Sequence, residues 1–235
     1  MLPVNSEREE IVALLRHLSH DMSAPVRQMR FFTERLIEFA EEHDQANDQA
    51  QNIEWIQRSL GKLDSMLSVI STYGKLIRTF APESVSCEEI GCQVEAALGT
   101  VLTECGVTDG FPTACARVTV DSRQLVFAFE HLLRNAAQFG QSDKPLKISL
   151  SLELHSDAIV YGVDDNGPGL EPELHDYCCQ LFHQANSETG GAGAGLALVT
   201  RIVENHQGTL TLGESALGGL RVEIQLPRQA RDESY

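Results

Sequence analysis

Two long apolar stripes in the first third of the sequence constrain its fold more than any other feature. Between residues 6 and 42, apolar side chains recur at every third or fourth position, and a second stripe of this kind runs over residues 53–80. This spacing predicts two long amphipathic helices. A polar cluster at residues 41–48 separates them, so we expect a short turn that joins the helices into an antiparallel hairpin.

A hairpin of this kind leaves half of its apolar surface uncovered, because each helix can meet its neighbour along only one side. Pairing two hairpins into a four-helix bundle buries the remainder. We therefore expect residues 1–82 to form a dimeric bundle and the chain to be a homodimer. The second helix is predicted to stop at Ala81-Pro82, because proline cannot continue the hydrogen-bond ladder of a helix.

The remainder of the chain, residues 83–228, mixes helical and strand patterns. Helices are predicted over 87–104, 121–139 and 196–206, and strands over 116–120, 147–154, 158–164, 209–212 and 219–226. Asp121 is a good N-cap for the helix that follows it. This order predicts an α + β chain whose second domain is an α/β sandwich, one sheet covered by helices on one side. Residues 229–235 are expected to form a disordered tail.

Charge and hydropathy exclude several classes of function. The chain carries 34 acidic and 18 basic residues, a net charge of −16, so we expect no nucleic-acid partner. No stretch approaches the roughly 18 apolar residues that a membrane span needs, and no signal peptide is recognisable. We therefore expect a cytoplasmic chain without a membrane segment. The six cysteines lack zinc-ligand spacing and are expected to be reduced thiols, with a redox role for Cys178-Cys179 as the alternative.

The first helix contains an unusual group of residues around His20. Asp21 follows the histidine directly, and Pro25 interrupts the helical pattern five residues later. An imidazole beside a carboxylate suits an exposed, chemically active histidine whose orientation the carboxylate fixes. The alternative is a solvated helix face that happens to contain a histidine.

A strand at the centre of the second domain runs into the turn Asp165-Asn166-Gly167-Pro168-Gly169. The Asp165 carboxylate at a strand end can accept a hydrogen bond from an exocyclic amine. Gly167 and Gly169 would let the backbone pass close to a flat ring. The same residues are also compatible with an ordinary surface turn.

A glycine-rich loop leads directly into the last predicted helix. Gly191, Gly193 and Gly195 precede Leu196, the predicted first residue of the helix. Free amide groups and the positive end of a helix dipole make such a loop a suitable phosphate site. A flexible linker would have a similar composition.

The helix predicted over residues 121–139 contains a third candidate group. His131 and Asn135 lie one turn apart on the same face, and the packed side is predicted to consist of Leu132, Leu133, Ala136 and Phe139. The amide oxygen of Asn135 suits Mg²⁺, which prefers hard oxygen ligands. The alternative is an asparagine that is merely solvated.

In their order along the chain, these motifs resemble those of the sensor histidine kinases of two-component signalling. The resemblance covers residues 8 to 227, from an H box around His20 through N, G1, F and G2 boxes to a closing strand. The F box is Leu181-Phe182. The resemblance implies a HisKA-like dimerisation and phosphoacceptor hairpin over residues 1–82. It also implies a Bergerat-fold, GHKL-type ATP-binding catalytic domain over residues 83–228.

The resemblance implies that the chain is an enzyme, an ATP-dependent protein-histidine kinase. His20 would take the γ-phosphoryl group of ATP, and Asp21 would act as its base or orienter. Asn135 would hold Mg²⁺, and Asp165 would bind the adenine amine. The other residues implied to bind the nucleotide are His131, Gln138, Gly167, Gly169, Gly191, Gly193, Gly195 and Leu196. The phosphoryl group would then pass to an aspartate of a response-regulator receiver domain.

The sequence departs from the family pattern at several positions. His131 stands where the family usually has asparagine, Gln138 where it has a basic residue, and the loop from His183 to Gly190 contains no lysine or arginine. Ala24 replaces a Thr or Asn that in many members orients the water for dephosphorylation. Since alanine has neither donor nor acceptor, we expect weak or absent phosphatase activity.

Two alternatives to a kinase stay open. The first is a degenerate kinase that acts as a phosphotransfer or scaffold adaptor without robust ATP-dependent autophosphorylation. The second is another ATPase of the superfamily, although such enzymes carry a glutamate where this chain has His131. No sensor module is visible before His20. The chain is therefore expected to be the core of a longer kinase, or a small kinase that takes its signal from an upstream sensor domain or partner protein.

Overall fold

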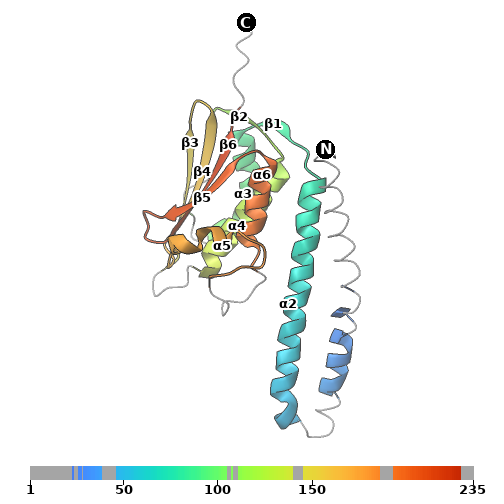
Figure 1. The fold of residues 1–235 in the computed structure, drawn as a ribbon. Helices are drawn as coiled ribbons and strands as arrows, with labels where there is room; N and C mark the ends of the chain where they lie inside the picture. The colour runs from blue at the N-terminus through green and yellow to red at the C-terminus, as the bar shows by residue number, and fades with distance from the viewer. Residues whose placement is uncertain are drawn as a thin grey trace. The chain divides into compact units, whose positions relative to one another are not determined.

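The computed structural model describes Ser23, Val26, Arg27 and residues 29–38, 46–104, 107, 111–139, 145–185 and 193–228. The chain divides into two compact units, with the main division between Arg78 and Thr79. The described part of the first unit is helical, and all the strands that the structure describes belong to the second (Figure 1).

The first unit contains helix α2, Ala46–Arg78, and a helical segment over residues 29–38. Val26, which lies just before the shorter segment, packs with Leu60 and Leu67 of α2 in a small buried cluster. An ion pair between Arg30 and Asp64 also joins the two. Two helical segments packed in this way agree with the predicted hairpin; residues 39–45, which connect them, lie outside the described residues.

The limits of α2 differ from the sequence prediction at both ends. The helix begins at Ala46, inside the predicted polar turn, and it ends at Arg78 rather than at Phe80. The apolar stripe locates only the packed face of a helix. It missed the first turns because alanine and glutamine, which are common there, are good helix formers without being strongly apolar.

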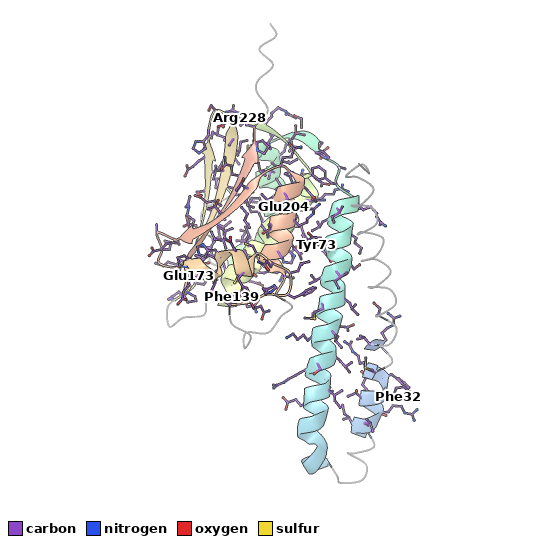
Figure 2. The ribbon with its side chains drawn as sticks, in the orientation of Figure 1. Phe32, Tyr73, Phe139, Glu173, Glu204 and Arg228 are labelled. Carbon is purple, nitrogen blue, oxygen red and sulfur yellow. The ribbon has the colours of Figure 1, made fainter. Side chains whose placement is uncertain are left out.

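Large apolar side chains remain exposed on the first unit. Among its described residues these are Met29, Phe31, Phe32, Leu36 and Ile56, each between 42% and 55% exposed. Figure 2 shows Phe32 on the side of its helix that faces away from α2. The described part of the first unit thus leaves apolar surface uncovered, in agreement with the two sequence stripes.

The second unit is built on a four-stranded antiparallel sheet with the strand order β3-β4-β6-β5. The strands are β3 (Ile148–Leu154), β4 (Ala158–Asp165), β5 (Thr209–Glu214) and β6 (Leu220–Pro227). Helices α3 (Cys87–Glu104), α4 (Ser122–Phe139) and α6 (Gly195–Asn205) lie over one face of this sheet (Figure 1). The predicted one-sided α/β sandwich is confirmed, and most predicted boundaries are correct to within two residues.

Alternation along the central strand explains which face the helices cover. Ile159, Tyr161 and Val163 of β4 are buried, and the Tyr161 ring lies 5.4 Å from that of Phe129 on α4. Asp165 continues this alternation, so its side chain belongs to the same face as the buried residues. The sheet therefore presents Asp165 on the side that the helices cover.

Three short elements escaped the sequence prediction. Strand β1 (Glu83–Ser86) pairs with β2 (Arg117–Val120) in a separate two-stranded sheet. A single 3-10 turn, η1 (Pro172–Leu174), and helix α5 (His175–Cys178) follow the turn after β4. Each has four residues or fewer, which is too short for a periodic pattern to appear.

The packed side of α4 was predicted correctly except at its end. Leu132, Leu133 and Ala136 are buried, but Phe139 is 40% exposed (Figure 2). Phe139 is the last residue of the helix, so the buried side ends one turn earlier than predicted.

The described cysteines are free thiols. Cys87 and Cys178 are buried, whereas Cys92 and Cys115 are exposed. Within the described ranges, none of the helices has both the length and the apolar character needed to cross a bilayer.

Candidate functional site

The structure describes part of the predicted site. His20, Asp21 and Gly191 lie outside the described residues, as does Ala24. The other predicted residues all lie in the second unit, on α4, at the end of β4 and around the start of α6. The predicted phosphoacceptor and the predicted phosphatase position therefore stay predictions.

Asn135 on α4 lies directly against Gly195, the first residue of α6. A Cβ atom at residue 195 would stand 2.9 Å from Asn135 Oδ1 and 3.0 Å from its Nδ2. Only a glycine leaves room for this approach. The fold thus brings the predicted metal ligand and the third glycine of the loop together, although 60 residues separate them in the sequence.

Gly193 lies against the backbone of the F box. It has a positive φ of 63°, and a Cβ atom there would stand 2.8 Å from the carbonyl oxygen of His183. Phe182 itself has a φ of 67°, a conformation that is uncommon for residues other than glycine. Gly193 therefore packs against an irregular segment. Its positive φ and its close contact with the His183 carbonyl both require glycine at this position.

The Asp165 carboxylate is held in place by backbone amides. Its Oδ1 accepts hydrogen bonds from the N–H groups of Gly167 at 2.8 Å and Leu220 at 3.0 Å. No donor among the described residues reaches Oδ2. One oxygen thus orients the group, and the other is left to accept a hydrogen bond from a ligand.

Asn166 in the turn after β4 is hydrogen-bonded to the segment that precedes β3. Asn166 accepts a hydrogen bond from the Lys147 N–H at 2.8 Å and donates one to the Pro145 carbonyl at 2.9 Å. Gly169 has a φ of 73°, a backbone conformation that favours glycine. The turn is a fixed part of the fold and not only a solvent-exposed loop.

Sequence reasoning missed two residues that shape this turn. The sequence predicts Asn166 only as a turn residue and Gly219 only as the start of a strand. A Cβ atom at residue 219 would collide with the Asp165 carboxylate. The sequence signal for Gly219 is weak, because the contact depends on the pairing of β4 with β6.

His131 lies one turn before Asn135 and is mostly buried. Its ring makes an edge-on contact with that of Phe127, with ring centroids 4.4 Å apart, and no described group makes a hydrogen bond to its buried Nε2. Burial lowers the pKa of His131, so the imidazole is neutral at pH 7. Gln138 on the same helix is exposed, and Leu196 on α6 is half-buried.

These contacts define three parts of the candidate site: an amide oxygen on α4, Gly193 and Gly195 at the start of α6, and an oriented carboxylate at the end of β4. Asn135 Oδ1 is a donor of the kind that Mg²⁺ accepts. Gly195 leaves backbone close to that oxygen, at the start of a helix, where phosphate groups are favoured. The donor set suits a nucleotide with its magnesium ion.

Residues 120–230 match a family model described as the histidine kinase-, DNA gyrase B- and HSP90-like ATPases. The match begins at the last residue of β2 and covers every residue of the site described above.

Curated relatives extend the similarity into the helical unit. The chain is 26% identical over 226 residues to the sensor histidine kinase CpxA of Escherichia coli (strain K12). This alignment covers 93% of this chain and 47% of that protein. It is 27% identical over 213 residues to the phytochrome-like protein Cph1 of Synechocystis sp. (strain ATCC 27184 / PCC 6803 / Kazusa), covering 89% of this chain and 28% of that protein. The chain thus spans less than half the length of either relative.

Solved structures share the fold. Histidine kinase ThkA in complex with the response regulator protein TrrA aligns with a TM-score of 0.64 at 17% identity, over 97% of this chain and 66% of that one. Full-length ShkA in complex with AMPPNP aligns with a TM-score of 0.57 at 22% identity, over 93% and 46% of the two chains.

Proposed function

We propose that this chain, a relative of the sensor histidine kinases with a GHKL-type ATPase domain, autophosphorylates His20 from Mg-ATP and passes the phosphoryl group to a response regulator. The observation that carries the proposal is the close approach of Asn135 to Gly195. A metal-binding oxygen and a phosphate-binding backbone must lie side by side in such a site, and any larger residue at 195 would separate them.

The second unit supplies the proposed nucleotide site. Oδ2 of Asp165 would accept a hydrogen bond from the adenine amine, and Gly167 and Gly169 would let the ring approach the backbone. Asn135 would hold Mg²⁺, which offsets the negative charge of the phosphate groups. The remaining nucleotide contacts are assigned to His131, Gln138, Gly191, Gly193, Gly195 and Leu196.

The first unit supplies the proposed phosphoacceptor. The Nε2 lone pair of His20 would form a bond to the γ-phosphorus while the bond from that phosphorus to the departing ADP oxygen breaks. Asp21 would accept a hydrogen bond from Nδ1–H and favour the tautomer with Nε2 free. The functional domains would then be residues 1–82 and 83–228. Because Ala24 cannot orient a water, phosphatase activity by this route would be weak or absent.

The partners follow from this activity. The exposed apolar stripe that includes Phe32 and Leu36 supports a homodimer through the helical unit. A response-regulator receiver domain is the proposed acceptor, and the related fold of ThkA occurs in a complex with such a regulator. Since the reaction consumes ATP, we assign this part of the protein to the cytoplasm.

A second candidate function is that of a degenerate kinase, an adaptor without robust autophosphorylation. The observation that favours it is the neutral, mostly buried imidazole of His131, on a helix whose end carries Gln138 and so brings no positive charge. A nucleotide held with fewer charged contacts binds more weakly.

Labelling with γ-³²P-ATP tests the proposal. The wild type should form an acid-labile phosphohistidine, His20→Ala should lose the label but keep nucleotide binding, and Asp165→Ala should lose both. His155→Ala, in the exposed turn between β3 and β4, is the matched control and should label normally.

Two results would contradict the assignment. A label retained in His20→Ala would place the phosphoacceptor elsewhere. A wild type that folds, dimerises and binds ATP without becoming labelled would favour the adaptor.

A further inference from the structure

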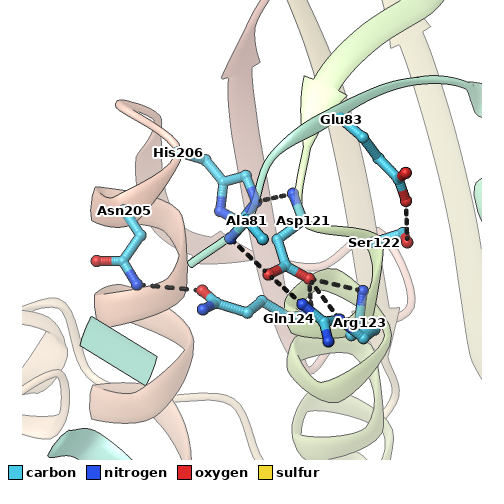
Figure 3. A network of polar contacts seen from close by, with 8 residues as sticks. All are labelled: Ala81, Glu83, Asp121, Ser122, Arg123, Gln124, Asn205 and His206. Atoms are coloured by element: carbon cyan, nitrogen blue, oxygen red, sulfur yellow. Dashed lines mark hydrogen bonds and ion pairs between the residues drawn. The ribbon is translucent and has the colours of Figure 1, made fainter. Parts of the chain in front are cut away.

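A polar network around the buried side chains of Asp121, Gln124 and His206 lies far along α4 and α6 from the proposed nucleotide contacts. We call it the Asp121–His206 network, and it comprises Ala81, Asp121, Gln124, Asn205 and His206 (Figure 3). It joins three segments: the chain that follows α2, the start of α4 and the end of α6. None of these residues was predicted to have a function beyond the N-cap at Asp121.

His206 uses both ring nitrogens. Its Nε2 accepts a hydrogen bond from the Asp121 N–H at 2.9 Å, and its Nδ1 lies 2.7 Å from the carbonyl oxygen of Ile202. Since a carbonyl can only accept, Nδ1 carries the proton and the ring is the neutral tautomer. The side chain is only 5% exposed, so it is committed to these two contacts.

Both oxygens of the Asp121 carboxylate also accept hydrogen bonds. Its Oδ1 caps α4 by accepting from the N–H of Arg123 at 3.2 Å and of Gln124 at 3.4 Å. Its Oδ2 accepts hydrogen bonds from the Ala81 N–H at 3.0 Å and from the Arg123 guanidinium at 3.2 Å. One buried carboxylate thus joins the start of α4 to the segment that follows α2.

That segment also touches His206 itself. The Phe80 ring packs edge-on against the imidazole, with centroids 4.9 Å apart. Phe80 and Ala81 are the second and third residues after Arg78, the last residue of α2. Within three residues after α2, the chain therefore contacts the start of α4 through Ala81 and the end of α6 through Phe80.

The two helices run antiparallel, with a contact at each end. The start of α4 meets the end of α6 at Asp121 and His206, and a second hydrogen bond, Asn205 to Gln124 at 3.1 Å, reinforces this end. Further along α4, Asn135 meets Gly195 at the start of α6. A helix can shift along its axis as a rigid body. The relative position of α4 and α6 at the Asp121–His206 contact therefore sets the distance between Asn135 and Gly195.

We propose that Asp121 and His206 are positioning residues for the nucleotide site and couple it to the Phe80–Ala81 segment. Through this coupling, a displacement of the chain that leaves α2 changes how closely Gly195 approaches Asn135. Because coupling is reciprocal, nucleotide binding must in turn tighten the contacts of Phe80 and Ala81. The proposal rests on the proposed function, since it requires that the site bind a nucleotide.

Calorimetric titration of variants of the whole 235-residue chain with a non-hydrolysable ATP analogue and Mg²⁺ tests the coupling. Phe80→Ala and His206→Leu should each weaken binding about 5-fold or more, the lower limit of a typical allosteric coupling. His206→Gln should bind nearly as the wild type does, because its amide oxygen can replace Nε2 as acceptor for the Asp121 N–H. Val85→Ala, which truncates a buried side chain on β1, is the control for lost stability alone.

Hydrogen exchange supplies a readout that a purely structural role would not move. Binding of the analogue should slow exchange of the Ala81 and Asp121 amides in the wild type but not in His206→Leu. Equal affinities in Phe80→Ala, His206→Leu and Val85→Ala at matched melting temperatures, or no change in exchange, would overturn the coupling alone. A folded wild type that fails to bind the analogue would overturn the proposed function together with it.

Discussion

The two units of this protein solve the problem of burying apolar surface in different ways. The second covers one face of its sheet with helices and buries residues such as Ile159, Leu133 and Ile224 almost completely. The described part of the first buries a cluster around Leu60 and Leu67 and leaves residues such as Phe31 and Phe32 more than half exposed. The difference teaches that the second unit buries its apolar residues through its own contacts, whereas the described part of the first leaves apolar surface that its own contacts do not cover.

The largest expected effect is a loss of stability confined to the second unit. Leu133→Ala should lower its free energy of unfolding by about 2–5 kcal/mol, because Leu133 is fully buried and truncation leaves a cavity. Chemical denaturation followed by circular dichroism measures the change. Leu36→Ala, at an exposed position on the first unit, is the comparison and should cost far less at low protein concentration.

If both variants were destabilised equally, the two units would not differ as described. The contrast would then have to be explained by cooperative unfolding of the whole chain.

The next effect concerns the site that the second unit positions. Gly195→Val should reduce nucleotide affinity about 100-fold, because its side chain would occupy the space of the Asn135 amide. Titration with an ATP analogue measures the loss. Gly99→Val is a matched control, since nothing lies within 4 Å of a Cβ atom at that helical position.

A smaller effect should appear in the assembly of the first unit. Phe32→Asp should weaken dimerisation about 10-fold or more, because a charge on the exposed stripe would have to be desolvated in the bundle. Sedimentation equilibrium measures the change in dissociation constant. Melting of the second unit should stay unchanged, and a variant that dimerises like the wild type would remove the stripe from the interface.

The smallest effect is a pH dependence of the second unit. Burial lowers the pKa of His206, so between its folded pKa and the unfolded value near 6.5 the unfolded state binds more protons. Stability is therefore fully present above about pH 6.5 and falls as the pH drops below it. His206→Gln should show a shallower decline in melting temperature between pH 7 and 5.5. An identical decline would assign the effect to His131, whose pKa burial also lowers.

Most of the second unit was predictable from local pattern. The bounds of α3 were predicted correctly, and Asp121 caps α4 as expected, because periodicity and capping are local properties of the sequence. Strand β1 was missed because its four residues show no alternation and depend on pairing with β2. Local pattern therefore identifies long elements and fails for those that only a partner stabilises.

The candidate site shows the same limit. Asn135, Asp165 and Gly195 were found as separate motifs, but their contacts arise from the packing of α4 on α6 and from the turn after β4. Gly219 and the Asp121–His206 network were not found, because their roles depend on strand pairing and on contacts between residues 85 positions apart. Motifs predicted which residue types take part, and the fold determines which of them meet.

The central claim is that the second unit binds Mg-ATP at the oriented Asp165 carboxylate and the Asn135–Gly195 contact, despite His131 and Gln138. Calorimetric titration of the wild type and of Asp165→Asn with an ATP analogue, each with and without Mg²⁺, tests it directly. The account predicts saturable binding of one nucleotide per chain that requires Mg²⁺ for full affinity and is lost in Asp165→Asn. Equal binding by the two proteins, or none by a folded wild type, would contradict it.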